Sequence, residues 1–164
     1  MEPRELPMLA RLFEYNDLAE MIEENTRGIE SGSMDIFVLL SEDELIGEIR
    51  VKYVGDDSLE TVKGRRAYLY AYRIRQEDRN KGFGKFLLRR VLDHLTEKGY
   101  TEFTVGVEDD NAAAKHIYRK FGFTETIARK QECYQGDSYE YDLLLKKNVP
   151  ILTDVILSNT EKTK

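Results

Sequence analysis

The sequence has little of what disulfide frameworks and zinc sites are built from. It contains one cysteine, Cys133, and two histidines among 164 residues. A single cysteine excludes an intrachain disulfide and suits a reducing, cytoplasmic setting. No HxxxH or CxxC spacing occurs. We therefore expect no metal in this protein.

Long hydrophobic runs are also missing. The apolar run at residues 36–40 is far shorter than the roughly 20 apolar residues that span a bilayer. The first residues lack the long apolar stretch of a signal peptide. We therefore expect a cytoplasmic protein with no membrane partner.

Positive charge is scarce overall, with 25 Lys and Arg against 31 Asp and Glu and a net charge of -6. This balance disfavours general binding of nucleic acid. The exception is residues 79–92, with five basic residues and no acidic one, which leaves a balance of -11 elsewhere. The length and the 41% apolar content fit one domain with a sizeable core. We place that domain at residues 1–148, followed by a C-terminal extension at 149–164 whose end we expect to be disordered.

The hydrophobic pattern predicts elements in the order β-α-β-β-β-α-β-α-β-β. Strands are expected at 8–14, 35–40, 45–53, 67–74, 101–107, 123–133 and 138–146. Helices are expected from 16 to about 26, from the glycines at 82 and 84 through 98, and at 111–121. Because hairpins mix with crossovers, this order predicts an α/β (α+β) protein with a single mixed, mostly antiparallel central sheet of about six or seven strands flanked by helices.

Period-two alternation assigns faces to two of these strands. In 45–53 it puts Glu48 with Arg50 and Lys52 on a half-solvated side. In 67–74 it puts three tyrosines and Ile74 on one face; the tyrosines are Tyr68, Tyr70 and Tyr72. They could line a pocket or pack under a helix.

A strand, a basic loop with two glycines and a helix follow one another at residues 67–98. Such a geometry binds anions, because a helix N-terminus exposes unpaired N–H groups. A P-loop would need Ser or Thr where Phe86 stands, and a dinucleotide fingerprint would need glycine where Leu87 stands. What remains is Arg79-x-x-Gly82-x-Gly84, which by itself fits a capped helix equally well.

A second motif follows about 30 residues later. Asn111 opens a helix, and Tyr118 lies seven residues on, which is nearly two turns, so both can address one ligand. Lys-Phe-Gly-Phe closes that helix. In this order and topology the two motifs resemble the GNAT superfamily of N-acetyltransferases, over about residues 34–146 and more weakly from residue 9.

The resemblance implies the acyl-CoA N-acyltransferase fold, in which acetyl-CoA lies where the two central parallel strands splay apart. Here those strands are 67–75 and 101–107. The backbone at Ile74 would pair with the pantetheine arm, Asn111 would contact the same arm, and Tyr118 would protonate the leaving CoA thiolate as general acid. The diphosphate would be held at Arg79, Asn80, Lys81, Gly82, Phe83, Gly84 and Lys85.

The implied activity is direct transfer of an acetyl group from acetyl-CoA to a primary amine of a small molecule or protein. An alkyl amine with a pKa of ~10 is only about one part in a thousand neutral at pH 7, so a base must take its proton. Family members often carry a glutamate on the strand before the phosphate loop, but 68–74 has no carboxylate. Glu48 on the neighbouring strand is the candidate base and Glu132 a weaker one. The competing interpretation makes Glu48 a solvated surface residue.

Several alternatives stay open at this point. Asp56, Asp57 and Glu60 could attract a cationic amine. Polyamine-like molecules, aminoglycosides, amino acids and protein amino groups all fit as acceptors. The same fold could also serve as a non-catalytic acyl-CoA-binding regulatory module. Nucleic-acid binding by residues 79–90 is a weaker interpretation. Homodimerisation through 149–157 or an edge strand is undecided.

Overall fold

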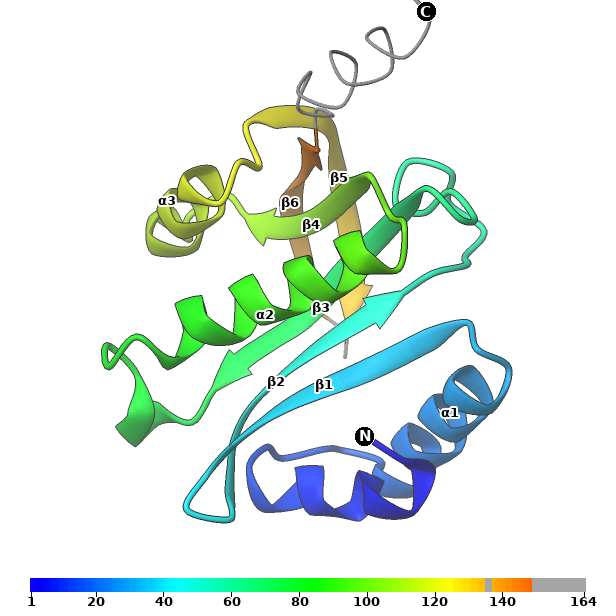
Figure 1. Ribbon diagram of the computed structural model, residues 1–164, viewed down its shortest axis with the longest axis vertical. Helices are drawn as coiled ribbons and strands as arrows, with labels where there is room; N and C mark the ends of the chain where they lie inside the picture. The colour runs from blue at the N-terminus through cyan, green and yellow to red at the C-terminus, as the bar shows by residue number, and fades with distance from the viewer. Residues whose placement is uncertain (135–136, 149–164) are drawn as a thin grey trace, which may run out of the picture.

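The computed structural model describes residues 1–134 and 137–148, so the expected extension at 149–164 lies outside the described residues. Six strands form one sheet in the order β1-β2-β3-β4-β6-β5, in which β3 and β4 are parallel and the other neighbours antiparallel (Figure 1). The strands are β1 Met34–Ser41, β2 Glu44–Lys52, β3 Arg66–Ile74, β4 Glu102–Glu108, β5 Glu125–Tyr134 and β6 Asp137–Lys147. The helices are η1 Pro3–Arg11, α1 Leu18–Glu30, η2 Gln76–Asp78, α2 Phe83–Glu97 and α3 Ala112–Lys120. The predicted mixed sheet is confirmed.

The strand expected at 8–14 is wrong, because the chain forms the 3₁₀ helix η1 over most of that stretch. Pro3 begins this helix and Pro7 lies inside it, just before the expected strand; a proline φ of about −65° favours a helical turn, which here continues to Arg11. Glu2 and Glu5 close the N-terminus as a capping box. Leu6 and Leu9 lie three residues apart, which is one 3₁₀ turn, and both are buried.

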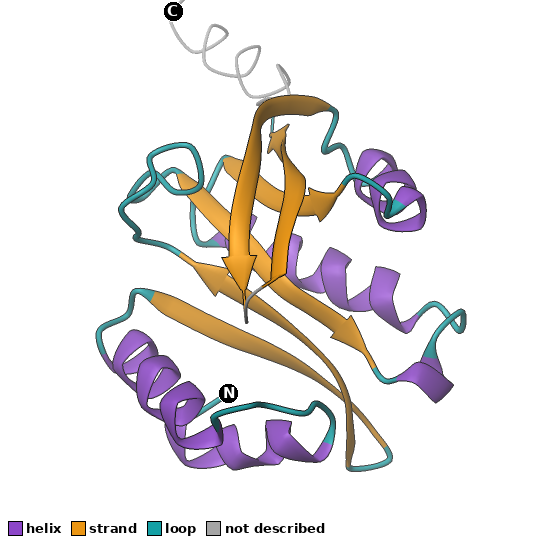
Figure 2. Cartoon of the chain, turned by 180° about the vertical axis from the view of Figure 1, so that it is seen from behind, coloured by secondary structure: helices purple, strands orange, loops and turns teal. Residues whose placement is uncertain are grey.

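Two hydrophobic clusters hold the layers together. On one face of the sheet, the apolar stripe of α2 packs on β2, β3 and β4, with residues such as Leu88, Leu95 and Phe103 at its centre. On the other face, Leu6 and Leu9 of η1 pack with α1 on β1. Seen from behind, the β5–β6 hairpin runs in front of the other strands while α2 lies behind them (Figure 2).

Strand β2 differs from the expected half-solvated strand. All seven residues from Leu45 to Val51 are buried. Its apolar side packs under α2 as predicted. Its polar side is covered by the N-terminal segment, which brings Tyr15 and Asn25 against it. The sequence pattern shows which residues share a side, but it cannot show that a distant segment covers the polar one.

A bulge in β3 changes which of its side chains share a face. Arg50 pairs with Tyr70, yet Glu48 pairs with Arg73, so β3 carries one extra residue at this point. Ala71 takes up the irregularity with a φ of 48°. The expectation that Tyr72 shares a face with Tyr68 and Tyr70 is therefore wrong. Tyr68 and Tyr70 stack on each other, with ring centroids 5.7 Å apart, whereas Tyr72 packs against the hydrophobic cluster between α2 and the sheet.

Candidate functional site

The two central parallel strands separate after a short paired stretch. β3 and β4 pair from Arg66 and Glu102 to Leu69 and Val105. Beyond that point β3 continues beside β2 as far as Ile74, and β4 continues beside β6. Figure 1 shows the two strands diverging. The facing edges of β3 and β4 thus lose their mutual hydrogen bonds, and the predicted splay is confirmed.

A tight turn joins β3 to α2 at the end of this splay. Asn80 and Gly82 both have left-handed backbone conformations, with φ of 61° and 88°. Gly82 is the N-cap of α2 and supplies no side-chain cap. The first backbone N–H groups of the helix, at Phe83, Gly84 and Lys85, therefore lack an intrahelical acceptor and present partial positive charge. This arrangement binds anions.

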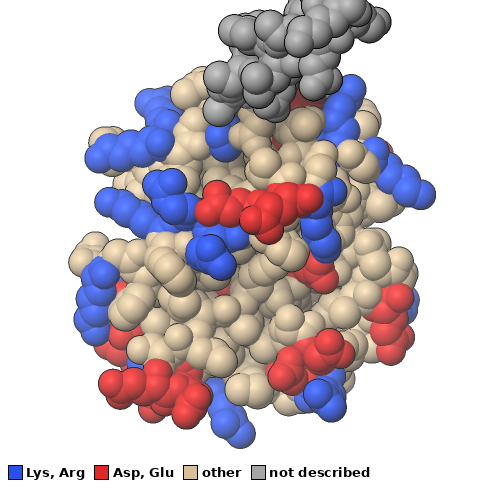
Figure 3. Space-filling model, in the orientation of Figure 1, with Lys and Arg blue, Asp and Glu red and all other residues tan. Residues whose placement is uncertain are grey.

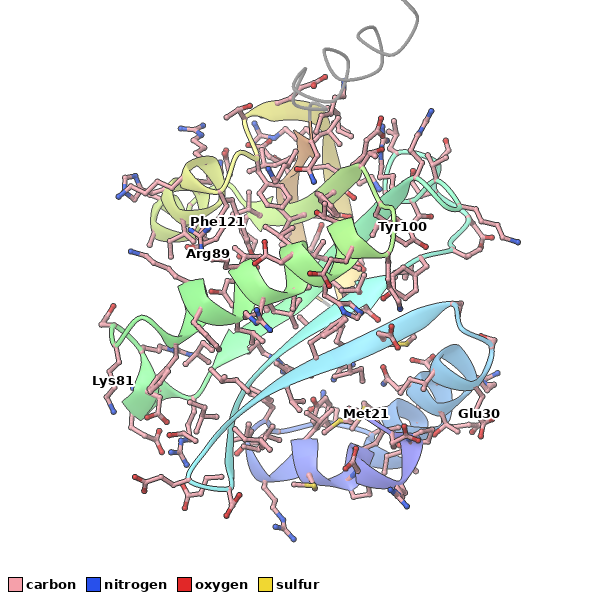
Figure 4. The ribbon with its side chains drawn as sticks, in the orientation of Figure 1. Met21, Glu30, Lys81, Arg89, Tyr100 and Phe121 are labelled. Carbon is pink, nitrogen blue, oxygen red and sulfur yellow. The ribbon has the colours of Figure 1, made fainter. Side chains whose placement is uncertain are left out.

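The basic side chains of the turn are partly committed to the protein itself. The Arg79 Nε donates to the carbonyl oxygen of Ile74 at 3.0 Å, which ties the turn to the end of β3. The Lys81 Nζ lies 3.1 Å from Asp78 Oδ1, and Figure 4 places Lys81 beside η2. Charge at the turn therefore comes from backbone amides as well as from side chains.

The second glycine of the motif allows close packing under the start of α2. A Cβ at Gly84 would meet the hydroxyl of Tyr72. The Tyr72 ring lies 6.2 Å from that of Tyr118 on α3, so it links the glycine turn to the second motif. Burial raises the pKa of Tyr72 to about 12.

Tyr118 lies inside the protein, between Tyr72 and Phe123, and its ring meets Phe123 edge-on at 5.7 Å. Burial, with a smaller contribution from Tyr72, raises the pKa of its hydroxyl. The phenol therefore keeps its proton at neutral pH. Asn111 is the N-cap of α3, where its Oδ1 accepts from the Ala114 N–H at 3.0 Å.

Glu48 has no exposed surface, so its interpretation as a solvated residue is wrong. Its Oε2 accepts from the Arg50 Nε at 3.1 Å, and its Oε1 is ion-paired with Arg73. The Tyr15 hydroxyl lies 3.5 Å from the same Oε1. Both carboxylate oxygens are thus held by guanidinium groups.

Four residues form a cluster around Glu48. Arg50 also donates to Asn25 Oδ1 at 3.3 Å and to the Tyr15 hydroxyl at 2.8 Å. Arg73 donates to the same hydroxyl at 2.8 Å. We call Tyr15, Asn25, Glu48, Arg50 and Arg73 the arginine cluster. Arg73 and Tyr15 were not singled out from the sequence, although Arg73 is the one charged residue among the apolar and aromatic residues 67–74.

The other acidic candidates are engaged elsewhere. Glu132 accepts from the Tyr139 hydroxyl at 2.9 Å on the β5–β6 hairpin. Asp57 and Glu60 are both ion-paired with Lys130 of β5, and the hydrogen bond that Lys130 donates lowers the pKa of Asp57. The negative charge expected to attract a cationic amine is therefore partly neutralised.

Basic side chains gather over α2 and α3 (Figure 3). A surface hollow between these helices is lined by Arg89, Arg90, Lys120 and Lys146, together with Asp93 and Glu97. The Arg89 guanidinium lies 5.3 Å from the Phe121 ring centroid (Figure 4). Among residues 1–134 and 137–148, no group of three or more His, Cys, Asp and Glu side chains could hold a metal ion. In the same part of the chain, no helix is long and apolar enough to span a membrane.

Comparisons with known proteins agree with this geometry. Residues 4–123 match the family model described as "Acetyltransferase (GNAT) family". The human N-acetyltransferase 8B is 29% identical over 90 residues, which are 55% of this chain and 38% of that protein. The chain thus matches well under half of that relative's length.

Two solved structures show the same fold. A ribosomal-protein-alanine N-acetyltransferase from Brucella melitensis superposes with a TM-score of 0.73 at 17% identity, covering 90% of this chain and 97% of the other. A GNAT family acetyltransferase from Elizabethkingia anophelis, with acetyl-CoA bound, superposes with a TM-score of 0.59 at 16% identity, covering 79% and 83%. The splayed sheet, the glycine turn and the family match lead to one conclusion: this chain belongs to the GNAT family of acetyltransferases.

Proposed function

We propose that the protein transfers an acetyl group from acetyl-CoA directly to a primary amine. The observation that carries this proposal is the separation of β3 and β4 next to the uncapped N-terminus of α2. An extended arm can pair with the edge of β3 that has left β4, while its diphosphate lies at the glycine turn. The left-handed residues Asn80 and Gly82 fit such a group, because nothing lies within 4 Å of a Cβ built at Gly82.

Acetyl-CoA would supply the reactive thioester, and the chain would hold it at named atoms. The backbone amides of residues 79–85 would bind the diphosphate, with added charge from Arg79, Lys81 and Lys85. The backbone at Ile74 and the side chain of Asn111 would contact the pantetheine arm. Since the Asn111 Oδ1 caps α3, its amide nitrogen is the atom left to donate to that arm.

Tyr118 is proposed as the general acid. A thiolate leaving group needs a proton, and a tyrosine phenol carries one at neutral pH. Burial raises the pKa of Tyr118 and makes it a weaker acid, so we propose that it gives up its proton only as negative charge develops on the sulfur. Its neighbour Tyr72 fixes the ring from the side of the glycine turn. This arrangement supports transfer of the phenol proton as the carbon–sulfur bond breaks.

Glu48 is proposed as the group that finally accepts the amine's proton. Because both of its oxygens bind guanidinium groups, we place the Tyr15 hydroxyl, which donates to Oε1 at 3.5 Å, between Glu48 and the amine. The amine would replace one of the two guanidinium donors on the phenol oxygen, give its proton to that oxygen, and the phenol would pass its own proton to Glu48. The test is the pH dependence of kcat/KM in the Glu48→Gln and Tyr15→Phe variants. A profile unchanged from wild type in both variants would remove Glu48 from proton transfer.

Thiol release from acetyl-CoA, measured across a panel of amines that includes peptides, tests the overall proposal. We expect release that depends on both acetyl-CoA and an amine, with initial rates that fit a ternary complex. Tight binding of acetyl-CoA without release across the whole panel would instead support a regulatory acyl-CoA-binding module.

A further inference from the structure

We infer that the acceptor amine also carries a carboxylate, and that Arg73 binds this carboxylate. The inference rests on the proposed function and narrows its acceptor to amino-acid-like molecules.

The arginine cluster carries an excess positive charge. Two guanidinium groups, of Arg50 and Arg73, surround the single carboxylate of Glu48. Its other members, Tyr15 and Asn25, are neutral at pH 7, since the pKa of Tyr15 is raised by burial and by Glu48. Arg50 is buried and Arg73 is partly buried, so an anion that joins them would relieve the repulsion between the two guanidinium groups. One further negative charge would balance the cluster.

The two arginines differ in how many donors they have used. The Arg50 side chain is 9% exposed, and its Nε, Nη1 and Nη2 each have a partner. Arg73 is 32% exposed and bonds to Glu48 and Tyr15 through Nη2 alone. Within the described residues, its buried Nε is the one buried side-chain nitrogen or oxygen without a hydrogen-bond partner. Arg50 thus uses each of its nitrogens within the protein, whereas Arg73 has donors and accessible surface left for a ligand.

Aromatic side chains hold the Arg73 guanidinium in place. Its central carbon lies 3.9 Å from the ring centroid of Phe13 and 5.5 Å from that of Tyr15. Stacking on these rings fixes the plane of the guanidinium and covers one side of it. A planar fork held this way can offer its Nη1 to a carboxylate while Nη2 stays on Glu48 and Tyr15, and little side-chain entropy is lost on binding.

Arg73 also lies where an acceptor has to come. It follows the Ala71 bulge, on the part of β3 that has left β4, and it precedes Ile74, the predicted pantetheine contact. Neighbouring residues of a strand are only ~3.3 Å apart. The Glu48–Tyr15 pair, our proposed proton path, contacts the same guanidinium. A carboxylate at Arg73 would therefore hold an amine a few bonds away close to both.

The same charges disfavour acceptors without an anion. A polyamine or an aminoglycoside would bring further positive charge towards two guanidinium groups that have one carboxylate between them. An amino acid brings the missing negative charge with its amine. Among the four acceptor classes that the sequence leaves open, the positive charge of the arginine cluster thus favours amino acids over polyamines and aminoglycosides.

Matched pairs of acceptors test the inference in the wild-type protein. Thiol release from acetyl-CoA is measured for L-amino acids and for their α-amides, with spermidine and an aminoglycoside included. We expect KM to be about 30-fold or more lower for the best amino acid than for its amide. The amide has the less basic amine, so amine basicity alone would favour the amide.

Variants then assign the preference to Arg73. Arg73→Gln should raise KM for the amino acid by a similar factor, with KM for the amide and for acetyl-CoA within about two-fold of wild type. Since Arg73 also contacts Glu48 and Tyr15, kcat should fall by the same factor for both acceptors, and the test is therefore the difference in KM. Arg73→Lys should recover part of the loss, because it keeps the charge but not the fork. Arg129→Gln, an exposed arginine on β5, is the matched control and should change neither acceptor.

Equal KM values for acid and amide in the wild-type protein would overturn the inference, as would turnover with spermidine but not with amino acids. An equal rise in KM for the acid and for the amide in Arg73→Gln would also overturn it, because loss of a purely structural arginine would have that effect. Absence of thiol release with every amine would refute the proposed function itself, which is a different outcome.

Discussion

Replacing Glu48 by glutamine should destabilise the protein far more than the loss of an ordinary surface ion pair. The amide has almost the same volume, so no cavity forms, but it carries no charge. It would leave Arg50, with a side chain 9% exposed, facing Arg73 without the carboxylate between them. Removing one partner of a buried pair costs about 3–5 kcal/mol. Because Arg73 is 32% exposed and so stays partly solvated, we expect the lower end of that range, about 3 kcal/mol.

Urea unfolding followed by circular dichroism measures this cost. With a slope of about 2 kcal/mol per molar urea, a 3 kcal/mol loss lowers the unfolding midpoint by about 1.5 M. Glu125→Gln is the matched control. Its pair with Lys147 is 3.4 Å long and about half exposed on both sides, so its loss should cost less than about 1 kcal/mol.

A double variant separates lost pairing from lost contacts. Glu48→Leu combined with Arg50→Met removes the two most buried charges together, and it should cost less than Glu48→Gln alone. If Glu48→Gln costs no more than Glu125→Gln, the reasoning about buried charge in the arginine cluster is refuted. If the double variant is the less stable of the two, the cost comes from packing.

Three further changes have defined outcomes. Tyr118→Phe should lower kcat about 100-fold or more while KM for acetyl-CoA stays within about two-fold, measured by steady-state thiol release; an unchanged kcat would exclude Tyr118 as the acid. Gly84→Ala places a Cβ against the Tyr72 hydroxyl, so it should cost about 1–3 kcal/mol in urea unfolding and raise KM for acetyl-CoA; wild-type values in both would show that Tyr72 moves aside freely. Burial raises the pKa of Tyr72 to about 12 from an ordinary value near 10. Between pH 10 and 12 the folded state therefore binds more protons than the unfolded state. The free energy of unfolding should then fall as pH rises through this range. Tyr72→Phe should flatten that slope in urea titrations at pH 9, 10 and 11, and a slope as steep as wild type would assign it to other groups.

The sequence was sufficient for what depends on local pattern. The glycine turn and the Asn111–Tyr118 helix stand out because spacing along the chain sets their geometry. The short apolar runs likewise predicted the strands at 35–40 and 101–107 within two residues. The splay came from the resemblance, and strand pairing that ends at Leu69 and Val105 confirms it.

What the sequence did not predict depends on distant contacts. Glu48 alternates with apolar residues as a surface strand residue would, and its burial depends on Tyr15, 33 residues away. The Ala71 bulge has no local signal, since neither glycine nor proline marks it. The helix η1 was mistaken for a strand because a few apolar residues near two prolines fit both periods.

The bulge at Ala71 fixes which side chains of β3 lie on which face of the sheet. Side chains alternate between the two faces in one order before the bulge and in the opposite order after it. Tyr70 and Tyr72 therefore lie on opposite faces. Inserting or deleting one residue between the bulge and Ile74 would exchange the side chains of the two faces while changing no residue type. This stretch should therefore tolerate substitution far better than a change of length, and the proteins that share the bulge should show gaps on either side of this segment but not within it.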